Sequence, residues 1–265
     1  MHTLMVVGII FVLTVVMIMS GRGGGNFYVA ALVLCGVPMH AASTTSQFIL
    51  LASAVMGAIV FGKARTMSWP LVFFFGGLNA SLAFLGGLEA HAFGGTTLKL
   101  VLSVVLFMAG VAMLFPEKQA TKTAVSRLGY WNIQEGGNRY VVNVWMAAPL
   151  TMATGFFSGM VGISGGSFLV PLMVVGCGVP MRIAVGTATA MLGATALTGF
   201  AGNALHGGFD PALAIPCGAA AIVGGLIGSK LALKTKPKSL KTLSGILTII
   251  AAIAMLGNAL SARAV

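Results

Sequence analysis

Long apolar segments, interrupted by glycines and a few charges, run through almost the whole sequence. Eight of them have about the length of a membrane-spanning helix, roughly 20 residues. They cover residues 3–20, 39–61, 69–88, 97–115, 143–161, 181–204, 211–229 and 240–261. Only 7% of the 265 residues are charged, whereas soluble globular domains carry about 25%. So few charges cannot cover a water-facing surface, and we predict an all-α polytopic membrane protein.

Two shorter apolar runs, at 26–37 and 167–179, decide how many times the chain crosses the membrane. With both counted, ten crossings and an outside N-terminus place thirteen of the 15 Lys and Arg on the cytoplasmic side, as orientation in membranes favours. Eight crossings would separate the basic clusters at 118–139 and 230–241. We therefore predict ten crossings, with the short runs as broken or half-helical crossings, although re-entrant loops would give the same pattern. The net charge of +11 then reflects orientation, and we expect no nucleic-acid partner.

The two halves of the chain resemble each other. Residues 21–27 align with 162–168, and residues 35–39 and 177–181 both read Cys-Gly-Val-Pro-Met. Since each copy holds an odd number of crossings, five, the second copy must be inverted in the membrane. We divide the chain into a first repeat at 1–115, a cytoplasmic linker at 116–142 and a second repeat at 143–265. Inverted repeats with paired broken helices are typical of secondary transporters that bind substrate near the midplane.

The glycine-rich break in each repeat is a candidate anion-binding site. A break frees backbone N–H groups, and the N-terminus of the helix that restarts after it favours negative charge. Close helix packing through small residues is the alternative explanation. Arg22 either neutralises an anion or serves as an ordinary cytoplasm-facing positive residue. The candidate residues at the two breaks are Arg22, Gly23, Gly24, Gly25, Asn26, Ser164, Gly165, Gly166 and Ser167.

Polar residues after the short runs complete the candidate site. Hydroxyl and amide groups can replace part of the hydration of an anion without burying another charge, although Ser and Thr also bond back to their own helix. No carboxylate lies within a predicted span, which argues against a cation channel or a carboxylate-based proton pump. We expect no metal and no cofactor, because the chain has no Cys/His cluster. The candidate residues of this set are Ser43, Thr45, Gln47, Thr187 and Thr189.

An enzyme-like motif, Gly162-Ile163-Ser164-Gly165-Gly166, offers an alternative function. It matches G-x-S-x-G and resembles the Gly-x-Ser-Gly of rhomboid intramembrane serine proteases, in which a histidine base would have to activate Ser164. His206 is the only histidine in that half, and the first repeat has Gly23 in place of the serine. The motif therefore indicates a backbone shape, and we expect no enzymatic activity. An anion channel is the other alternative.

The motif Gly162-x-x-Gly165-Gly166-x-x-x-x-Pro171, followed by Gly178-Val179-Pro180 and Ala184-x-x-Thr187, resembles the signature of the sulfite exporter TauE/SafE family. The resemblance implies a multi-pass permease of the bacterial inner membrane for sulfite, thiosulfate, sulfoacetate or arylsulfonates. The expected partners are such a small sulfur-containing anion and membrane lipid. The first repeat departs from the signature at Arg22, Asn26 and Ala31. Direction of transport, coupling to protons and oligomeric state stay open.

Overall fold

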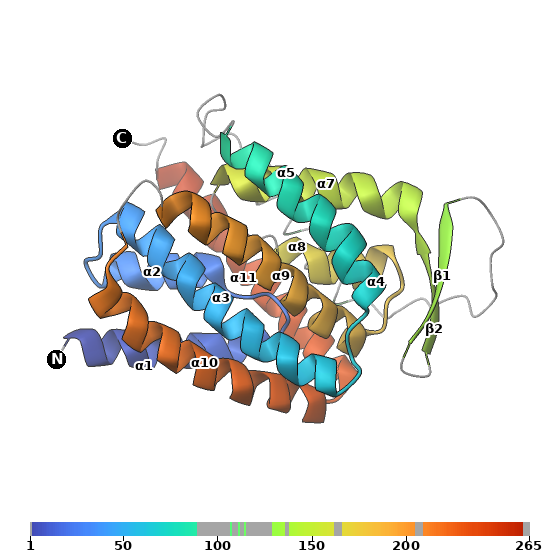
Figure 1. Cartoon of the computed structure of the whole chain (residues 1–265), viewed down its shortest axis with the longest axis horizontal. Coiled ribbons are helices and arrows are strands. Elements are labelled where there is room, and N and C mark those ends of the chain that lie inside the picture. The colour runs from blue at the N-terminus through green and yellow to red at the C-terminus, as the bar shows by residue number, and fades with distance from the viewer. Residues whose placement is uncertain are drawn as a thin grey trace.

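The computed structural model of the chain describes residues 2–88, 129–135, 138–161, 166–204 and 209–261, together with Phe107, Val111 and Leu114. These residues form a bundle of helices with a small β-hairpin at one edge (Figure 1). The first half of the chain contains α1 (His2–Met19), α2 (Gly25–Leu34), α3 (Met39–Lys63), α4 (Trp69–Leu71), the π-helical η1 (Val72–Gly76) and α5 (Gly77–Leu88). The second half contains β1 (Tyr130–Glu135), β2 (Asn138–Asn143), α7 (Val144–Val161), α8 (Gly166–Pro171), the π-helical η3 (Leu172–Gly176), α9 (Met181–Ala204), α10 (Pro211–Lys234) and α11 (Pro237–Ser261).

The helices lie where the apolar runs predict them. The short run at 26–37 contains α2, and the run at 167–179 contains most of α8 and all of η3. The predicted span at 97–115 lies almost wholly outside the described residues. Among the described residues, three helical segments are long and apolar enough to cross a membrane, namely Thr44–Lys63, Met181–Ala201 and Pro211–Lys234. The helical, membrane-compatible character of the chain is therefore confirmed.

A two-stranded hairpin corrects the prediction of an all-α fold. β1 and β2 pair antiparallel, with Trp131 opposite Val142 and Ile133 opposite Tyr140. Alternate side chains of a strand share one face, and Ile133, Tyr140 and Val142 are buried in the same apolar cluster as residues of the helices. The hairpin lies in the segment at 116–142 that we interpreted as a polar linker. Its charged residues obscured the alternation of apolar side chains.

Four close helix pairs hold the described part of the bundle together. α3 packs on α9 and on α10, α1 packs on α10, and α5 packs on α7 (Figure 1). Small residues permit this approach, as is common in membrane bundles. A Cβ atom at Gly228 of α10 would lie 2.5 Å from the carbonyl oxygen of Val15, and one at Gly155 of α7 would lie 2.6 Å from that of Asn79. Larger residues at these glycines would force the helices apart.

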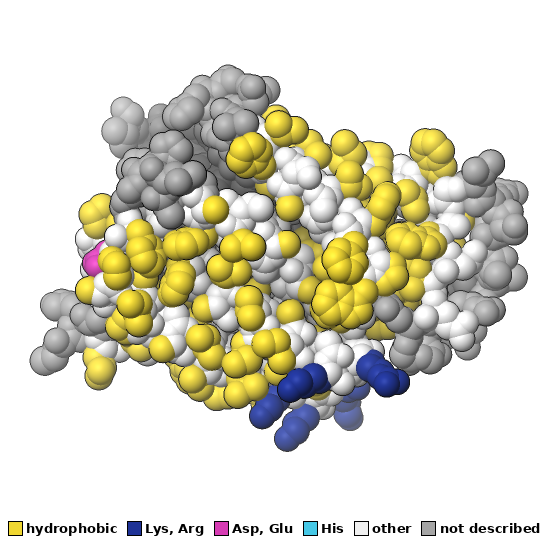
Figure 2. Space-filling model, in the orientation of Figure 1, with side chains coloured by type: hydrophobic (Ala, Val, Ile, Leu, Met, Phe, Trp, Pro, Cys, Tyr) yellow, Lys and Arg dark blue, Asp and Glu magenta, His cyan; other side chains and the backbone are white. Residues whose placement is uncertain are grey.

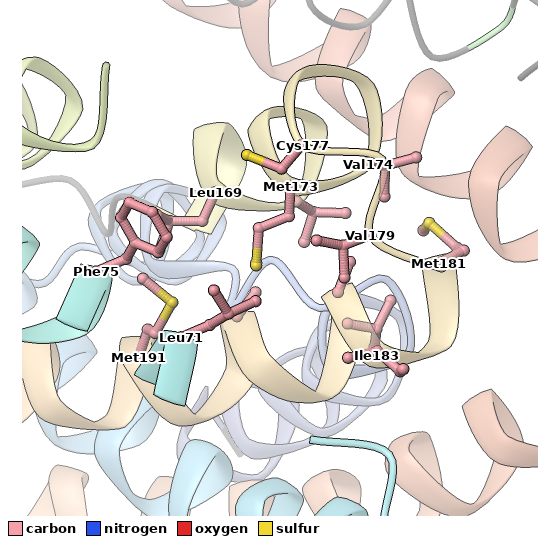
Figure 3. Close-up of a cluster of buried hydrophobic side chains, with 14 of the residues drawn as sticks. Leu71, Phe75, Leu169, Met173, Val174, Cys177, Val179, Met181, Ile183 and Met191 are labelled. Atoms are coloured by element: carbon pink, nitrogen blue, oxygen red, sulfur yellow. The ribbon is translucent and has the colours of Figure 1, made fainter. Parts of the chain in front are cut away.

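The two Cys-Gly-Val-Pro-Met turns, at residues 35–39 and 177–181, share a local backbone but differ in their surroundings. The glycine of each turn has a positive φ, +87° in the first and +64° in the second. Cys35 is half-buried, whereas Cys177 is buried. The second turn belongs to the apolar cluster that also contains Val142 of the hairpin, and part of this cluster is drawn in Figure 3. The hairpin therefore packs on one turn of the pair.

Positive charges gather at one end of the bundle, where α3 and α10 end and α11 begins (Figure 2). Asp210 lies at the other end of α10, where its carboxylate accepts a hydrogen bond from the Ala212 backbone N–H at 3.0 Å. The 24 residues of α10 extend for about 36 Å at about 1.5 Å per residue, more than the roughly 30 Å hydrocarbon core of a bilayer. The exposed basic residues of this end are Lys63, Arg65, Lys230, Lys234, Lys236 and Lys238.

Candidate functional site

The first glycine-rich break joins α1 to α2 in the middle of the bundle. Three of its glycines have left-handed backbone angles, with φ of +74° at Gly21, +71° at Gly23 and +69° at Gly24. A Cβ atom at Gly23 would lie 2.6 Å from Leu50 Cδ1 and 2.8 Å from Leu192 Cδ1. These two leucines lie near the midpoints of α3 and α9. The predicted cradle therefore lies at mid-depth, between the two central helices.

The break is closely packed in this conformation. A Cβ atom at Gly21 would lie 2.8 Å from the Cα of Val185, and one at Gly24 would lie 2.6 Å from the Cγ of Met17. Close packing is the alternative explanation that the sequence leaves open for these glycines. It accounts for their small size here, and their use as an anion cradle stays a prediction.

Arg22 is the charged residue of this break, and its side chain is only 1% exposed. Its Nη1 donates to the backbone carbonyl oxygen of Ser244 in α11, over 3.4 Å. An arginine that only sets membrane orientation lies in a loop that faces water, so the burial favours the anion-binding interpretation. A guanidinium carries five donors in a planar fork and can hold two oxygens of one oxyanion.

The polar residues near the start of α3 lie beside the break. Ser46, which our selection of candidate residues passes over, donates from Oγ to the carbonyl oxygen of Gly25 at 3.0 Å. Thr45 is fully buried, and its hydroxyl has no hydrogen-bond partner among the described residues. Gln47 packs against α9, since a Cβ atom at Gly199 would lie 2.9 Å from the Gln47 amide oxygen. Thr45 and Gln47 stay predicted binding residues.

The two predicted threonines of α9 make different contacts. Thr187 Oγ1 accepts a hydrogen bond from the Ser68 backbone N–H at 3.0 Å, which ties α9 to the residue that precedes α4. Thr189 Oγ1 donates to the Val185 carbonyl oxygen of its own helix at 2.8 Å. Both threonines are fully buried. Thr187 therefore joins the two halves of the chain through its hydroxyl, whereas the Thr189 hydroxyl bonds within α9.

The remaining candidates are only partly covered by the described residues. Ser164 and Gly165 lie outside the described residues, so the serine-protease function stays an alternative. The other four lie within helices, at the positions where each short helix or the polar patch was expected. These four are Asn26 in α2, Ser43 in α3, and Gly166 and Ser167 in α8.

Sequence reasoning misses Ser244, which the structure places next to Arg22. Ser244 is fully buried, and its Oγ has no hydrogen-bond partner among the described residues. A single serine in an apolar helix gives no signal in the sequence, because serine in a helix commonly bonds back to the preceding turn. Only the packing of α11 against the break reveals the position.

An apolar pocket lies away from the break, between η1, α7, η3 and α9. Leu71, Phe75, Met173 and Met191, all drawn in Figure 3, line it, and Thr151 is the one hydroxyl in its lining. None of the predicted binding residues whose side chains the structure describes lines this pocket. Since an anion needs positive charge or hydrogen-bond donors when it leaves water, we place the candidate site at the break.

The family comparison agrees with the resemblance drawn from the glycine motifs. The sequence pattern of a family described as "Sulfite exporter TauE/SafE" matches residues 6–255 of this chain, nearly its whole length. The chain belongs to the sulfite exporter TauE/SafE family. The resemblance stated from the sequence is thereby confirmed, and the matched region includes both breaks and all the candidate residues.

Two relatives support the same assignment for this TauE/SafE member. "Probable membrane transporter protein YunE" of Bacillus subtilis (strain 168) is 21% identical over 243 residues, which make up 87% of this chain and 88% of that protein. A "Probable membrane transporter protein" of Xylella fastidiosa (strain 9a5c) is 26% identical over 214 residues, 79% of this chain and 77% of the relative. No solved structure matches the chain. The chain is a membrane transporter of the TauE/SafE type.

Proposed function

We propose that this TauE/SafE protein is a secondary transporter that moves a small sulfur oxyanion or organosulfonate across the bacterial inner membrane by alternating access. The proposed substrates are sulfite, thiosulfate, sulfoacetate and arylsulfonates. The observation that carries this proposal is Arg22, a buried guanidinium at a helix break in the middle of the bundle. The proposal assigns the chain no enzymatic activity.

The surroundings of Arg22 suit a negatively charged group. α2 begins at Gly25, three residues after Arg22 in the chain, and the N–H groups and positive dipole end of a helix N-terminus favour an anion. The buried Thr45 hydroxyl of α3, which has no hydrogen-bond partner among the described residues, supplies a further donor. A sulfur oxyanion offers several acceptor oxygens to such a set, and a charge-assisted pair between guanidinium and oxyanion is about twice as strong as a neutral hydrogen bond.

We further propose two inverted repeats with five crossings each. Support comes from the way the helices pair. In the proposed repeats α7 is equivalent to α1, α10 is equivalent to the segment from α4 to α5, and α9 is equivalent to α3. The pair of α1 with α10 is then equivalent to the pair of α7 with α5, and the pair of α3 with α9 is equivalent to itself. All of these pairs are close contacts in the bundle, and inverted repeats around a midplane site can alternate access by rocking against each other.

The need for a coupling ion depends on the direction of transport relative to the membrane potential. An anion leaves the cell along an inside-negative potential, so export needs no coupling ion. Import of the same anion would oppose the potential, and protons are then the proposed coupling ion. The protein faces lipid through apolar side chains such as Ile222, Ile227 and Leu231 of α10, which are exposed in the bundle.

Thermal unfolding of the detergent-purified protein tests the proposed substrate class. We expect a higher melting temperature with at least one of sulfite, thiosulfate, sulfoacetate and toluenesulfonate, and no such effect from sulfate. A ligand that binds only the folded state adds about 2.7 kcal/mol of stability at a hundred times its Kd. If none of these sulfur anions stabilises the wild-type protein at millimolar concentration, the proposed substrate class is wrong.

Arg22 variants in the same assay test the site. Arg22→Gln should bind the stabilising anion at least about tenfold more weakly, because a hydrogen bond to a charged group contributes about 1.5–3 kcal/mol. Arg22→Lys keeps the charge but loses the fork, and it should lie between the wild type and Arg22→Gln. Arg182→Gln is the matched control, since Arg182 donates to the Thr235 carbonyl oxygen at 3.1 Å at the start of α9. Equal affinity in wild type and Arg22→Gln would remove Arg22 from the site.

A further inference from the structure

Ser244 carries a buried hydroxyl beside a charged group. It lies on α11, its residue is fully buried, and its Oγ has no hydrogen-bond partner among the described residues. The carbonyl oxygen of the same residue accepts from Arg22 Nη1 at 3.4 Å. Because one residue supplies both atoms, the hydroxyl and the guanidinium belong to the same small region between α11 and the break.

Several other buried hydroxyls of the bundle donate within their own helices. Thr248, one turn further along α11, donates to the Ser244 carbonyl oxygen at 2.7 Å. Ser229 of α10 donates to Gly225 at 2.7 Å, and Thr14 of α1 donates to Ile10 at 2.7 Å. This bond to the residue four positions earlier is the usual choice for Ser and Thr in a helix, and Ser244 does not make it.

An unsatisfied buried hydroxyl needs an explanation, because it loses its hydrogen bonds to water and gains none in return. Arg22 cannot accept the Ser244 proton, since a guanidinium has donors only. The Ser244 proton therefore still lacks an acceptor, and an acceptor that also suits the neighbouring cation is an anion.

We propose that Ser244 is a substrate-binding residue that donates a hydrogen bond to the oxyanion held by Arg22. This inference rests on the proposed function and adds a residue from the second half of the chain to its site. A sulfite or sulfonate group has three oxygens on one sulfur. The guanidinium fork accommodates two of them, and the Ser244 hydroxyl accommodates the third, which joins α11 to the first break through the substrate.

The test compares Ser244→Ala with Ser229→Ala, two fully buried serines of the second half. Each variant is purified in detergent, and its Kd for the stabilising sulfur anion and its melting temperature without ligand are measured. Ser244→Ala should raise the Kd about tenfold or more, as expected for a lost hydrogen bond to a charged group. Its ligand-free melting temperature should equal or exceed that of wild type. Ser229→Ala should leave the Kd unchanged and lower the ligand-free melting temperature.

Two further variants keep the test decisive if Ser244→Ala does not fold. Ser244→Thr keeps the hydroxyl and should bind nearly as wild type, whereas Ser244→Cys has only a weak donor and should bind less tightly. A Kd unchanged in both Ser244→Ala and Ser244→Cys overturns the role of Ser244. So does a ligand-free melting temperature that falls in Ser244→Ala as far as in Ser229→Ala, since that result marks a structural hydroxyl.

The outcome also separates this inference from the proposed function. Loss of binding in Arg22→Gln together with wild-type binding in Ser244→Ala overturns only the role of Ser244. Wild-type binding in both variants overturns the site at the break as well. Loss of binding in both, with ligand-free stability kept in Ser244→Ala, supports a shared site.

Discussion

Gly21 and Gly23 tolerate no larger residue for two reasons, a left-handed backbone and close packing. The sequence predicts the first reason but not the second. A run of glycines predicts a break, since glycine populates positive φ more easily than any other residue, and both positions have a φ above +70°. Two of the residues that pack against the break, Val185 and Leu192, lie far away in the second half. No local pattern predicts those contacts, because they arise only when the two halves pack.

Gly21→Ala and Gly36→Ala separate backbone strain from packing. Both alanines would have to adopt a left-handed backbone, which costs about 1–2 kcal/mol. At Gly21 the new Cβ would also lie 2.8 Å from the Val185 Cα, whereas at Gly36 nothing lies within 4 Å. Gly21→Ala should therefore lower the melting temperature in detergent clearly more than Gly36→Ala. Equal losses would mean that the contact with Val185 relaxes freely.

At the scale of elements, the sequence predicts the helices well and the hairpin badly. Apolar runs of about 20 residues indicate membrane helices almost regardless of what packs against them, and α3, α9 and α10 follow from that rule. The hairpin needed a different reading of residues 130–143, in which Gly136-Gly137 separates two segments of alternating character, a signal typical of a β-hairpin. Its buried face forms only against helices that are distant in the sequence, including η1, where Phe74 contacts Trp131, so hydrophobicity averaged along the chain does not reveal it.

Thr187→Val tests the contact between α9 and the start of α4. Removal of the hydroxyl leaves the buried Ser68 N–H, now bonded to Thr187 Oγ1 at 3.0 Å, without that acceptor, and we expect a loss of about 1–3 kcal/mol in the free energy of unfolding. Thr189→Val should lose less, because the Thr189 hydroxyl bonds only to its own helix. Denaturant or thermal unfolding in one detergent measures both variants. A larger loss for Thr189→Val would contradict the assignment.

At the scale of the whole molecule, the repeat in the sequence predicts more than the local patterns do. It places the two short helices in equivalent positions and relates Ser68 to Asp210, and both residues precede the first turn of a helix. Neither the depth of Arg22 nor its neighbour on α11 follows from the repeat, because Arg22 has no charged counterpart in the second copy. The repeat therefore does not predict these two features of the candidate site, and only the three-dimensional structure shows them.

The distribution of charge along α10 predicts how the protein sits in the membrane. In a variant whose native cysteines are replaced by alanine, Lys234→Cys should react with a membrane-impermeant thiol reagent only after the cells are permeabilised, because we expect the basic end to face the cytoplasm. Ala212→Cys, at the end of α10 next to Asp210, should react in intact cells. The opposite pattern of labelling would invert the proposed topology.

The hairpin gives the two identical turns unequal surroundings, and this has a thermodynamic consequence under the proposed alternating access. Two inverted repeats with equal packing would make the inward-facing and outward-facing states equal in free energy. The hairpin buries apolar side chains in the cluster of the second turn, whereas Cys35 of the first turn stays half-buried. Every 1.4 kcal/mol of difference between the two states changes their ratio about tenfold, so under that proposal we expect the empty transporter to favour one side of its cycle.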